Sequence, residues 1–249
     1  MELRLLYHLG KYLKMMSRVF KKPENFNMYW TELFRQMNDI GIGSLPIVGL
    51  ISVFIGMVTA VQFAYQLDGN LVPRYYIGYV VRDISIIELA PTITSLVLAG
   101  KVGSNMASEI GGMRQKEHID AMEIMGVNTI GYLILPRVLA AIIVIPMLVT
   151  LASFISIIGG YISSVPSNLI PSADYIRGVR SFFVPYNVFM MLVKSFVFSY
   201  ILTTISCYQG YYVKSGSIEL GKASTQAVVY SDIVILLADY IIALLLTAA

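Results

Sequence analysis

Residues 138–173 read VLAAIIVIPMLVTLASFISIIGGYISSVPSNLIPSA and contain no Asp, Glu, Lys or Arg. A bilayer core of about 30 Å is crossed by roughly 20 apolar residues in a helix, so this stretch is long enough to span a membrane. The rest of the chain agrees, because 57% of its 249 residues are hydrophobic and only 13% are charged, against about 25% charged in soluble domains. The sequence therefore predicts a polytopic membrane protein and excludes a water-soluble enzyme.

The same search predicts five membrane-spanning helices in all. Their approximate ranges are 44–67, 84–107, 131–161, 188–211 and 225–247. Charges inside a span are costly, and they mark either an ion or proton path or a structural pair. A pair between Asp239 and Lys194 fits this pattern, and Asp232 is close enough to a helix end to reach water, but the sequence leaves the roles of these three residues open. A further charge, Glu88, must face a cavity or a partner.

The N-terminal region, 1–39, precedes a membrane domain over 40–249. Apolar residues recur at helical spacing between basic ones; they are Leu5, Leu6, Leu9, Leu13, Met16 and Phe20. This mixture predicts an interfacial helix lying on an anionic leaflet, with a solvated amphipathic helix as the alternative. Basic residues interrupt this region throughout, so we expect no cleavable signal peptide.

The distribution of Lys and Arg predicts the orientation. With the N-terminus in the cytoplasm, eleven basic residues outside the spans are cytoplasmic and four, Arg74, Arg82, Arg177 and Arg180, are external. Cytoplasmic loops carry the excess of Lys and Arg, so five spans place the C-terminus in the periplasm.

The net charge of +3 is too small to indicate nucleic-acid binding. The single cysteine, Cys207, excludes a disulfide framework and a cysteine-based zinc site.

Charge is concentrated in the loop between the second and third spans, SEIGGMRQKEHIDAMEIMG at 108–126. Residues 114–125 contain neither Gly nor Pro, and Gly126 follows them, so a short amphipathic cytoplasmic helix is expected over 114–125. Such a helix either docks into a partner's groove or is part of a plain surface loop. The candidate docking residues are Arg114, Glu117, Asp120, Met122 and Glu123.

Two further patterns concern helix faces. Thr59, Gln62 and Gln66 share one face of the first span, which suits either an amphiphilic ligand or a structural hydrogen-bond cluster. Small residues recur every fourth position in the second span, at Ser95, Ala99, Gly103, Ala107 and Gly111. Such a stripe allows close helix approach, within one subunit or across a dimer.

The stretch ELAPTITSLVLAGKVGSNMASEIGGM at 88–113, followed by EHIDAMEIMG at 117–126, resembles the signature of the MlaE (YrbE) permease family. FIGMV at 54–58 and GKASTQAVV at 221–229 resemble two further segments of that family. The sequence departs from the family pattern at Ala90, Lys101, His118 and Lys222, where Gly, Arg, Gln and Arg are usual. A lysine cannot make the forked contact of an arginine, which puts bidentate phosphate binding at the two lysines in doubt.

This resemblance implies an ABC transporter permease that moves phospholipids across the envelope of double-membraned bacteria and is located in the inner membrane. It implies cytoplasmic ATPase subunits docked on 114–125 and a periplasmic MCE-domain lipid-binding protein. Because five helices enclose little, a homodimer with a shared cavity is expected. The lipid-binding cavity is expected at Thr59, Gln62, Gln66, Leu67, Glu88 and Leu89, and no cofactor, metal or catalytic residue is expected.

Two other functions remain as alternatives. A proton-coupled secondary transporter acting without an ATPase would use Glu88, Asp232 and Asp239, although such folds often show two matching halves and no internal repeat is evident here. A non-transporting scaffold would explain the docking loop but not the polar face of the first span.

The segment 216–223 has the spacing of a phosphate-binding loop, but Ala223 stands where Ser or Thr is required. We therefore expect the chain itself not to hydrolyse ATP.

Overall fold

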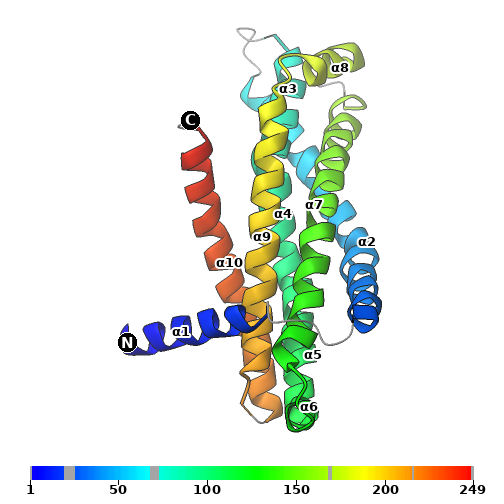
Figure 1. The fold of residues 1–249 in the computed structure, drawn as a ribbon. Helices are drawn as coiled ribbons and strands as arrows, with labels where there is room; N and C mark the ends of the chain where they lie inside the picture. The colour runs from blue at the N-terminus through cyan, green and yellow to red at the C-terminus, as the bar shows by residue number, and fades with distance from the viewer. Residues whose placement is uncertain (1, 20–25, 68–72, 168–169, 215, 248–249) are drawn as a thin grey trace. The chain divides into compact units, whose positions relative to one another are not determined.

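A computed structural model describes residues 2–19, 26–67, 73–167, 170–214 and 216–247, and the regular structure in these ranges is helical throughout (Figure 1). Five helical stretches in them are long and apolar enough to cross a membrane: Tyr29–Gln66, Tyr75–Gln115, Thr129–Ser164, Pro185–Tyr211 and Ser217–Leu246. The predicted all-α membrane class with five spans is thus confirmed. Each helix begins before its predicted span, because the apolar window ends at polar or charged residues whereas the helical backbone continues past them.

The second span is built from five consecutive helical elements. They are α3 (Tyr75–Ile84), the π-helical turn η1 (Ser85–Leu89), α4 (Ala90–Leu98), the π-helical turn η2 (Ala99–Gly103) and α5 (Ser104–Gln115). A π-helical turn inserts one residue into the helical repeat and often occurs at functional sites. Glu88 lies in η1 and Lys101 in η2, so the two charged residues of the predicted range 84–107 lie where the helix is widened.

The N-terminal region differs from the prediction. The helix α1 is Glu2–Val19, whereas α2 is Phe26–Gln66 and continues without a break from residue 26 through the first span. The predicted interfacial stretch therefore contains two helices, and the expected boundary at residue 39 lies inside α2. The search for uncharged windows placed a boundary at Asp39, but an isolated charge does not interrupt the helical backbone.

The chain divides into two compact units, and the long helices contribute to both. The first unit comprises Met1–Gly41, Leu98–Val144 and Ser199–Ile235, and the second comprises Ile42–Val97, Ile145–Phe198 and Leu236–Ala249.

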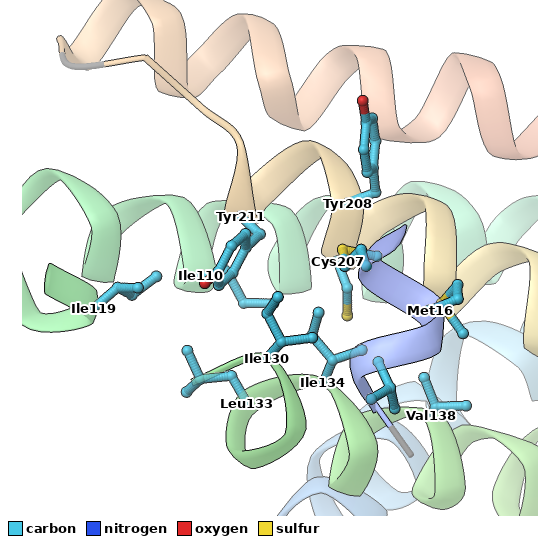
Figure 2. Packing of buried hydrophobic residues seen from close by; sticks show 12 residues of the cluster. Met16, Ile110, Ile119, Ile130, Leu133, Ile134, Val138, Cys207, Tyr208 and Tyr211 are labelled. Atoms are coloured by element: carbon cyan, nitrogen blue, oxygen red, sulfur yellow. The ribbon is translucent and has the colours of Figure 1, made fainter. Parts of the chain in front are cut away.

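The core of the first unit joins α1 to four other helices. Met16 of α1, Ile110 of α5, Ile119 of α6 (His118–Ile124), Ile134 of α7 (Thr129–Ser164) and Cys207 of α9 (Pro185–Tyr211) belong to one buried cluster (Figure 2). Tyr12 of α1 packs against the edge of this cluster. Burial raises the pKa of its hydroxyl, which donates to Thr204 Oγ1 at 2.8 Å. The predicted amphipathic helix α1 thus buries one face against protein.

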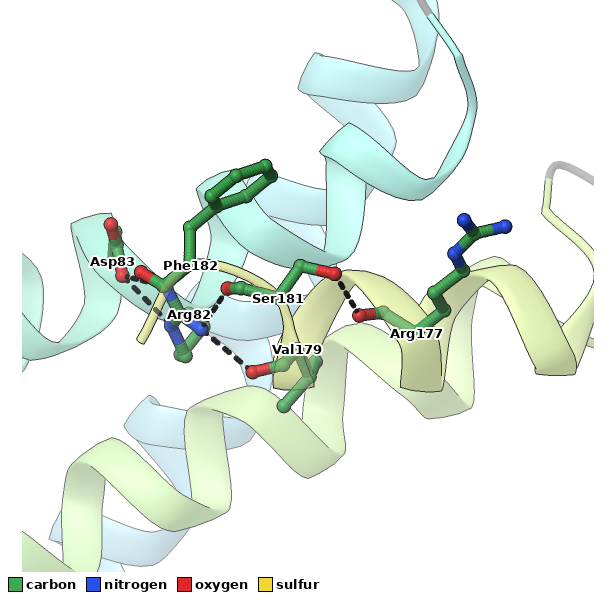
Figure 3. A network of polar contacts seen from close by, with 6 residues as sticks. All are labelled: Arg82, Asp83, Arg177, Val179, Ser181 and Phe182. Carbon is green, nitrogen blue, oxygen red and sulfur yellow. Dashed lines mark hydrogen bonds and ion pairs between the residues drawn. The ribbon is translucent and has the colours of Figure 1, made fainter. Parts of the chain in front are cut away.

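In the second unit, α3 packs against α8 (Ser172–Arg180). Arg82 of α3 is 2% exposed, and its Nη1 donates to the carbonyls of Val179 and Ser181 at 2.7 Å each (Figure 3). Its Nε donates to Asp83 Oδ1 at 2.8 Å. The last carbonyls of a helix have no partner within the helix, so the buried guanidinium satisfies the C-terminal end of α8.

Helices α2 and α7 approach closely at glycines in the second unit. A Cβ atom on Gly56 would collide with the carbonyl of Ser156, and one on Gly159 would collide with the backbone of Val53. By contrast, a Cβ on Gly49 of α2 would meet only Ile155 Cδ1, at 3.9 Å. Small residues at such positions let two backbones pack closely within a membrane.

We expect Gly56→Ala to destabilise the protein by about 1–3 kcal/mol, the usual cost of overpacking. Gly49→Ala, on the same helix, is the matched control and should change stability little because its added methyl makes an ordinary contact. The measurement is thermal unfolding of both variants in detergent. Equal melting temperatures for the two variants would show that this backbone contact is not tight.

Candidate functional site

The helix α6 connects the second and third spans, and it begins later than predicted. Helix α5 ends at Gln115 and α6 is His118–Ile124, with Glu117 between them at φ 58°. The predicted continuous helix over 114–125 is therefore wrong. A left-handed residue interrupts it, and residues other than Gly, Asn and Asp adopt that conformation rarely.

Two polar contacts hold α6 against neighbouring helices of the first unit. Arg114 Nη1 lies 2.9 Å from Asp120 Oδ1, which joins the end of α5 to α6. The Tyr211 hydroxyl at the end of α9 donates to Glu123 Oε1 at 2.8 Å. Three of the residues predicted to dock a partner, Arg114, Asp120 and Glu123, therefore also position α6 within its own chain.

The apolar residues of α6, together with Met125 directly after it, divide between two faces. Ile119 is 0% exposed in the core cluster and Met122 is half-buried against it, whereas Ile124 is 88% exposed and Met125 is 71% exposed. Five residues advance a helix by about 140° beyond one turn, so Ile124 cannot share the face of Ile119. Ile124 and Met125 were missed as candidate docking residues, although this spacing could have identified them. Glu117, the remaining candidate, is exposed.

A second candidate site lies in the second unit, where a lysine meets two carboxylates. Lys194 of α9 is 0% exposed, and its Nζ lies 2.6 Å from Glu88 Oε2 and 2.6 Å from Asp239 Oδ1 of α10 (Ser217–Thr247). Thr92 Oγ1 donates to Asp239 Oδ2 at 3.0 Å. The anticipated pair of Asp239 with Lys194 is present, and Glu88 joins it. We call Glu88, Thr92, Lys194 and Asp239 the charged cluster.

The charged cluster is buried on one side and open on the other. Lys194 is fully buried and the Asp239 side chain is 8% exposed, whereas the Glu88 side chain is 48% exposed. Glu88 is thus the member that an external ligand can reach. Asp232, by contrast, is half-buried and belongs to the first unit, so it is not part of this cluster.

The residues predicted to line a lipid cavity have different environments. Thr59 is buried, and its hydroxyl donates to the Ile55 carbonyl at 2.7 Å within α2. Gln62 and Gln66 are exposed on the same helix, and Leu67 and Leu89 are half-buried. The hydroxyl of Thr59 is therefore used by its own helix, whereas Gln62, Gln66 and Glu88 keep accessible polar groups.

The small-residue stripe packs against α9 of the same chain along 103–111. A Cβ on Gly103 would lie 2.7 Å from Ser206 Oγ, and one on Gly210 would lie 2.7 Å from the Ala107 carbonyl. Gly111 faces the side chain of Leu220. Of the two interpretations, packing within one subunit is the one that these contacts support here.

The fold and the two sites define a multi-pass α-helical membrane protein with a short helix fixed between two of its spans. The chain belongs to the MlaE permease family, since the family model described as Permease MlaE matches residues 33–245. It is 36% identical to a probable ABC transporter permease protein of Rickettsia bellii over 244 residues, which cover 96% of this chain and 92% of that protein.

More distant relatives come from photosynthetic organisms. A probable ABC transporter permease protein of Synechocystis is 34% identical over 216 residues, covering 85% of this chain and 80% of the relative. The chloroplastic protein TRIGALACTOSYLDIACYLGLYCEROL 1 of Arabidopsis thaliana is 31% identical over 220 residues, covering 86% of this chain and 61% of the relative. The resemblance found in the sequence motifs is confirmed over most of the chain.

Proposed function

We propose that this permease is the membrane subunit of an ABC transporter that moves phospholipids between the bacterial inner membrane and the outer envelope. ATP is hydrolysed by separate cytoplasmic subunits that dock on α6. The observation that carries the proposal is the geometry of α6: Ile124 and Met125 are exposed, while Asp120 and Glu123 connect the helix to Arg114 and Tyr211. Relatives named as probable ABC transporter permeases support the assignment to an ATP-driven system.

The same contacts suggest how a partner's movement reaches the membrane. In our proposal, the ATPase subunits bind the exposed apolar side of α6 and move it when they close on nucleotide. The Arg114–Asp120 ion pair transmits the displacement to α5, and the Tyr211–Glu123 hydrogen bond transmits it to α9. Packed interfaces of this kind switch between discrete arrangements, so a small shift at α6 can change helix packing farther along the spans.

Two copies of the chain form a two-fold dimer around a shared cavity in this proposal, with a periplasmic MCE-domain protein at the outer end. Closed two-fold symmetry is the commonest arrangement of homo-oligomers. Many apolar side chains on the spans of one chain are exposed. On α10 they include Ile233, Leu237 and Ile241, which are each at least half exposed. Such side chains suit lipid or a second copy of the protein.

The phospholipid is proposed to bind beside α2, with its headgroup near Gln62, Gln66 and Glu88 and its acyl chains on apolar surface such as Phe54 and Val58. Phe54 and Val58 are 58% and 54% exposed. In this proposal Leu67 and Leu89, which are both half-buried, also contact the acyl chains. Thr59 is buried, so a bulky residue there would disturb packing before it blocked a cavity, and Gln62 is the better position for a probe.

A photo-crosslinking residue at Gln62 is expected to form an adduct with phospholipid, and trapping the ATPases with vanadate should reduce its yield. The reduction is expected because closure changes the cavity, whereas bulk lipid is unaffected. The matched control is Ile143 of α7, which is 45% exposed and should label lipid equally in both states. An adduct at position 62 that never responds to nucleotide would place the transported lipid elsewhere.

The proposed orientation puts α6 in the cytoplasm and α8 in the periplasm. In a Cys207→Ala background, single cysteines at the exposed positions Lys116 and Ser172 should react with an impermeant thiol reagent from opposite sides of the membrane. The native Cys207 is fully buried, so it should react only slowly with the reagent. Its removal eliminates this slow background labelling. Reaction of both positions from the same side would contradict the five-span arrangement.

The proton-coupled alternative would use the carboxylates of Glu88, Asp232 and Asp239. Asp239 and Glu88 both lie within an ion-pair distance of Lys194, which gives these groups a structural role that requires no proton transport. Family membership also favours an ATPase partner over an independent transporter.

A further inference from the structure

A pocket of about 440 Å³ lies between α1 and the end of α9 in the first unit. Its lining residues are Tyr7, Gly10, Lys11, Lys14, Arg18 and Tyr212. Residues spaced three and four apart share one side of a helix, so the five residues from α1 form one continuous face. Three of them are cations, and none of the described residues that line the pocket is acidic. We call this the basic pocket.

The helix α1 is anchored to α9 by residues on the face beside the basic pocket. His8 Nδ1 and the Tyr208 hydroxyl are 2.8 Å apart, and the Tyr12 hydroxyl donates to Thr204 Oγ1 at 2.8 Å. Met15 and Val19, on the protein-facing side of α1, are 0% and 1% exposed. The helix α1, which carries the three cations, is therefore held against α9 by His8 and Tyr12 as well as by the contact of Lys11 with Tyr212.

The positive charge of the pocket has no acidic partner in the part of the chain that the structure describes. Among the described residues, no carboxylate oxygen lies within 4.0 Å of the cationic groups of Lys11, Lys14 or Arg18. Lys11 Nζ lies 3.8 Å from the centroid of the Tyr212 ring. Burial and, to a smaller extent, repulsion from the charge of Arg114 lower the pKa of Lys11. An anion would relieve this repulsion.

The other exposed surface of α1 indicates where the anion comes from. Leu9 and Leu13 are 49% and 64% exposed and lie one helical turn apart, away from the basic face. A helix with one open apolar stripe and one basic face lies in the membrane interface, where it meets lipid headgroups. Basic pockets at the cytoplasmic surface of membrane proteins recognise anionic headgroups. A soluble phosphate would leave the apolar stripe unexplained.

We propose that the basic pocket binds the phosphate group of an anionic phospholipid from the surrounding leaflet. In this proposal the cations of Lys11, Lys14 and Arg18 contact the phosphate, and Tyr7 and Tyr212, which also line the pocket, donate hydrogen bonds to it. This lipid is a resident ligand, separate from the transported lipid beside Gln62. The site also lies next to α6, because the ring of Tyr212 contacts that of Tyr211, which donates to Glu123.

The test measures lipid binding to the purified full-length protein by native mass spectrometry, with added dioleoyl phosphatidylglycerol or dioleoyl phosphatidylcholine. The unmodified protein should retain phosphatidylglycerol preferentially. The double variant Lys14→Gln, Arg18→Gln should bind phosphatidylglycerol roughly 30-fold more weakly, if each removed charge contributes as basic residues near an anionic surface usually do. Lys11 is kept so that its contact with Tyr212 is preserved.

Two matched variants separate the pocket from general charge effects. Arg35→Gln with Lys214→Gln removes two exposed basic residues outside the pocket and should bind like the unmodified protein. Lys14→Arg keeps the charge and should do the same. Equal affinity for the two lipids, or an equal loss in the Arg35/Lys214 control, would overturn the proposal. Binding of glycerol 3-phosphate as tight as that of phosphatidylglycerol would overturn the assignment to lipid.

The experiment needs neither an ATPase nor transport. Its failure would therefore leave the proposed transport function intact, and failure of transport would leave the binding result intact.

Discussion

Replacing Lys194 by Met is expected to destabilise the protein by about 3–5 kcal/mol, the usual cost of removing one partner from a buried ion pair. Lys194 is the fully buried member of the charged cluster, and it lies 2.6 Å from a carboxylate oxygen of both Glu88 and Asp239. Without the ammonium group, two carboxylates face each other beside apolar surface. We expect a large fall in the melting temperature in detergent and little assembled transporter.

The control for this prediction removes all three charges together. Lys194→Met combined with Glu88→Gln and Asp239→Asn leaves no uncompensated charge, and buried ion pairs replaced as a set often cost little stability. We therefore expect the triple variant to melt close to the unmodified protein. If Lys194→Met alone is as stable as the triple variant, the charged cluster is not the structural centre described here.

The second large effect is expected at α6. Ile124→Glu places a charge on an apolar residue that is 88% exposed in the free chain. Surface substitutions usually change stability by at most about 0.5 kcal/mol, so the variant should fold normally. Binding of the ATPase should nevertheless weaken by roughly 30-fold or more, because central interface residues contribute at least about 2 kcal/mol when truncated. The measurements are thermal unfolding and co-purification with the ATPase.

Ile119→Ala, on the same helix, is expected to have the opposite effects: it should lower stability and leave ATPase binding unchanged. Ile119 is 0% exposed, so the truncation should cost about 2–5 kcal/mol of stability. The folded fraction should still bind the ATPase, because the exposed side of α6 is unchanged. Loss of docking in Ile119→Ala with normal docking in Ile124→Glu would invert the assignment of the two faces.

The membrane class and the number of spans could be predicted because long apolar windows report directly on the bilayer. Helix ends could not be predicted as well, because an apolar window ends where polar and charged residues become frequent, whereas the helical backbone continues past them. Asp39 lies inside α2, and Arg82, inside the second helical stretch, is satisfied by the carbonyls of Val179 and Ser181. Such pairings depend on tertiary structure and leave no local signal.

The candidate sites could be predicted only in part, because their geometry also depends on tertiary structure. The motif around 117–126 located α6, but nothing in its composition indicated that Glu117 would adopt a left-handed conformation. The contact of Glu88 with Lys194 depends on the relative rotation of two helices. Thr59 counted as polar in the sequence, yet a threonine hydroxyl can bond to the carbonyl four residues earlier and then pack as part of the protein interior.

The central claim is that this chain moves phospholipid with energy from separate ATPase subunits. The most direct test reconstitutes the purified permease with its ATPase in proteoliposomes and follows transfer of a fluorescent phospholipid to an added acceptor protein. Our account predicts transfer that requires ATP and the ATPase, is lost in Ile124→Glu, and continues when the proton gradient is collapsed. Transfer by the permease alone, driven by a proton gradient and unaffected by ATP, would contradict it.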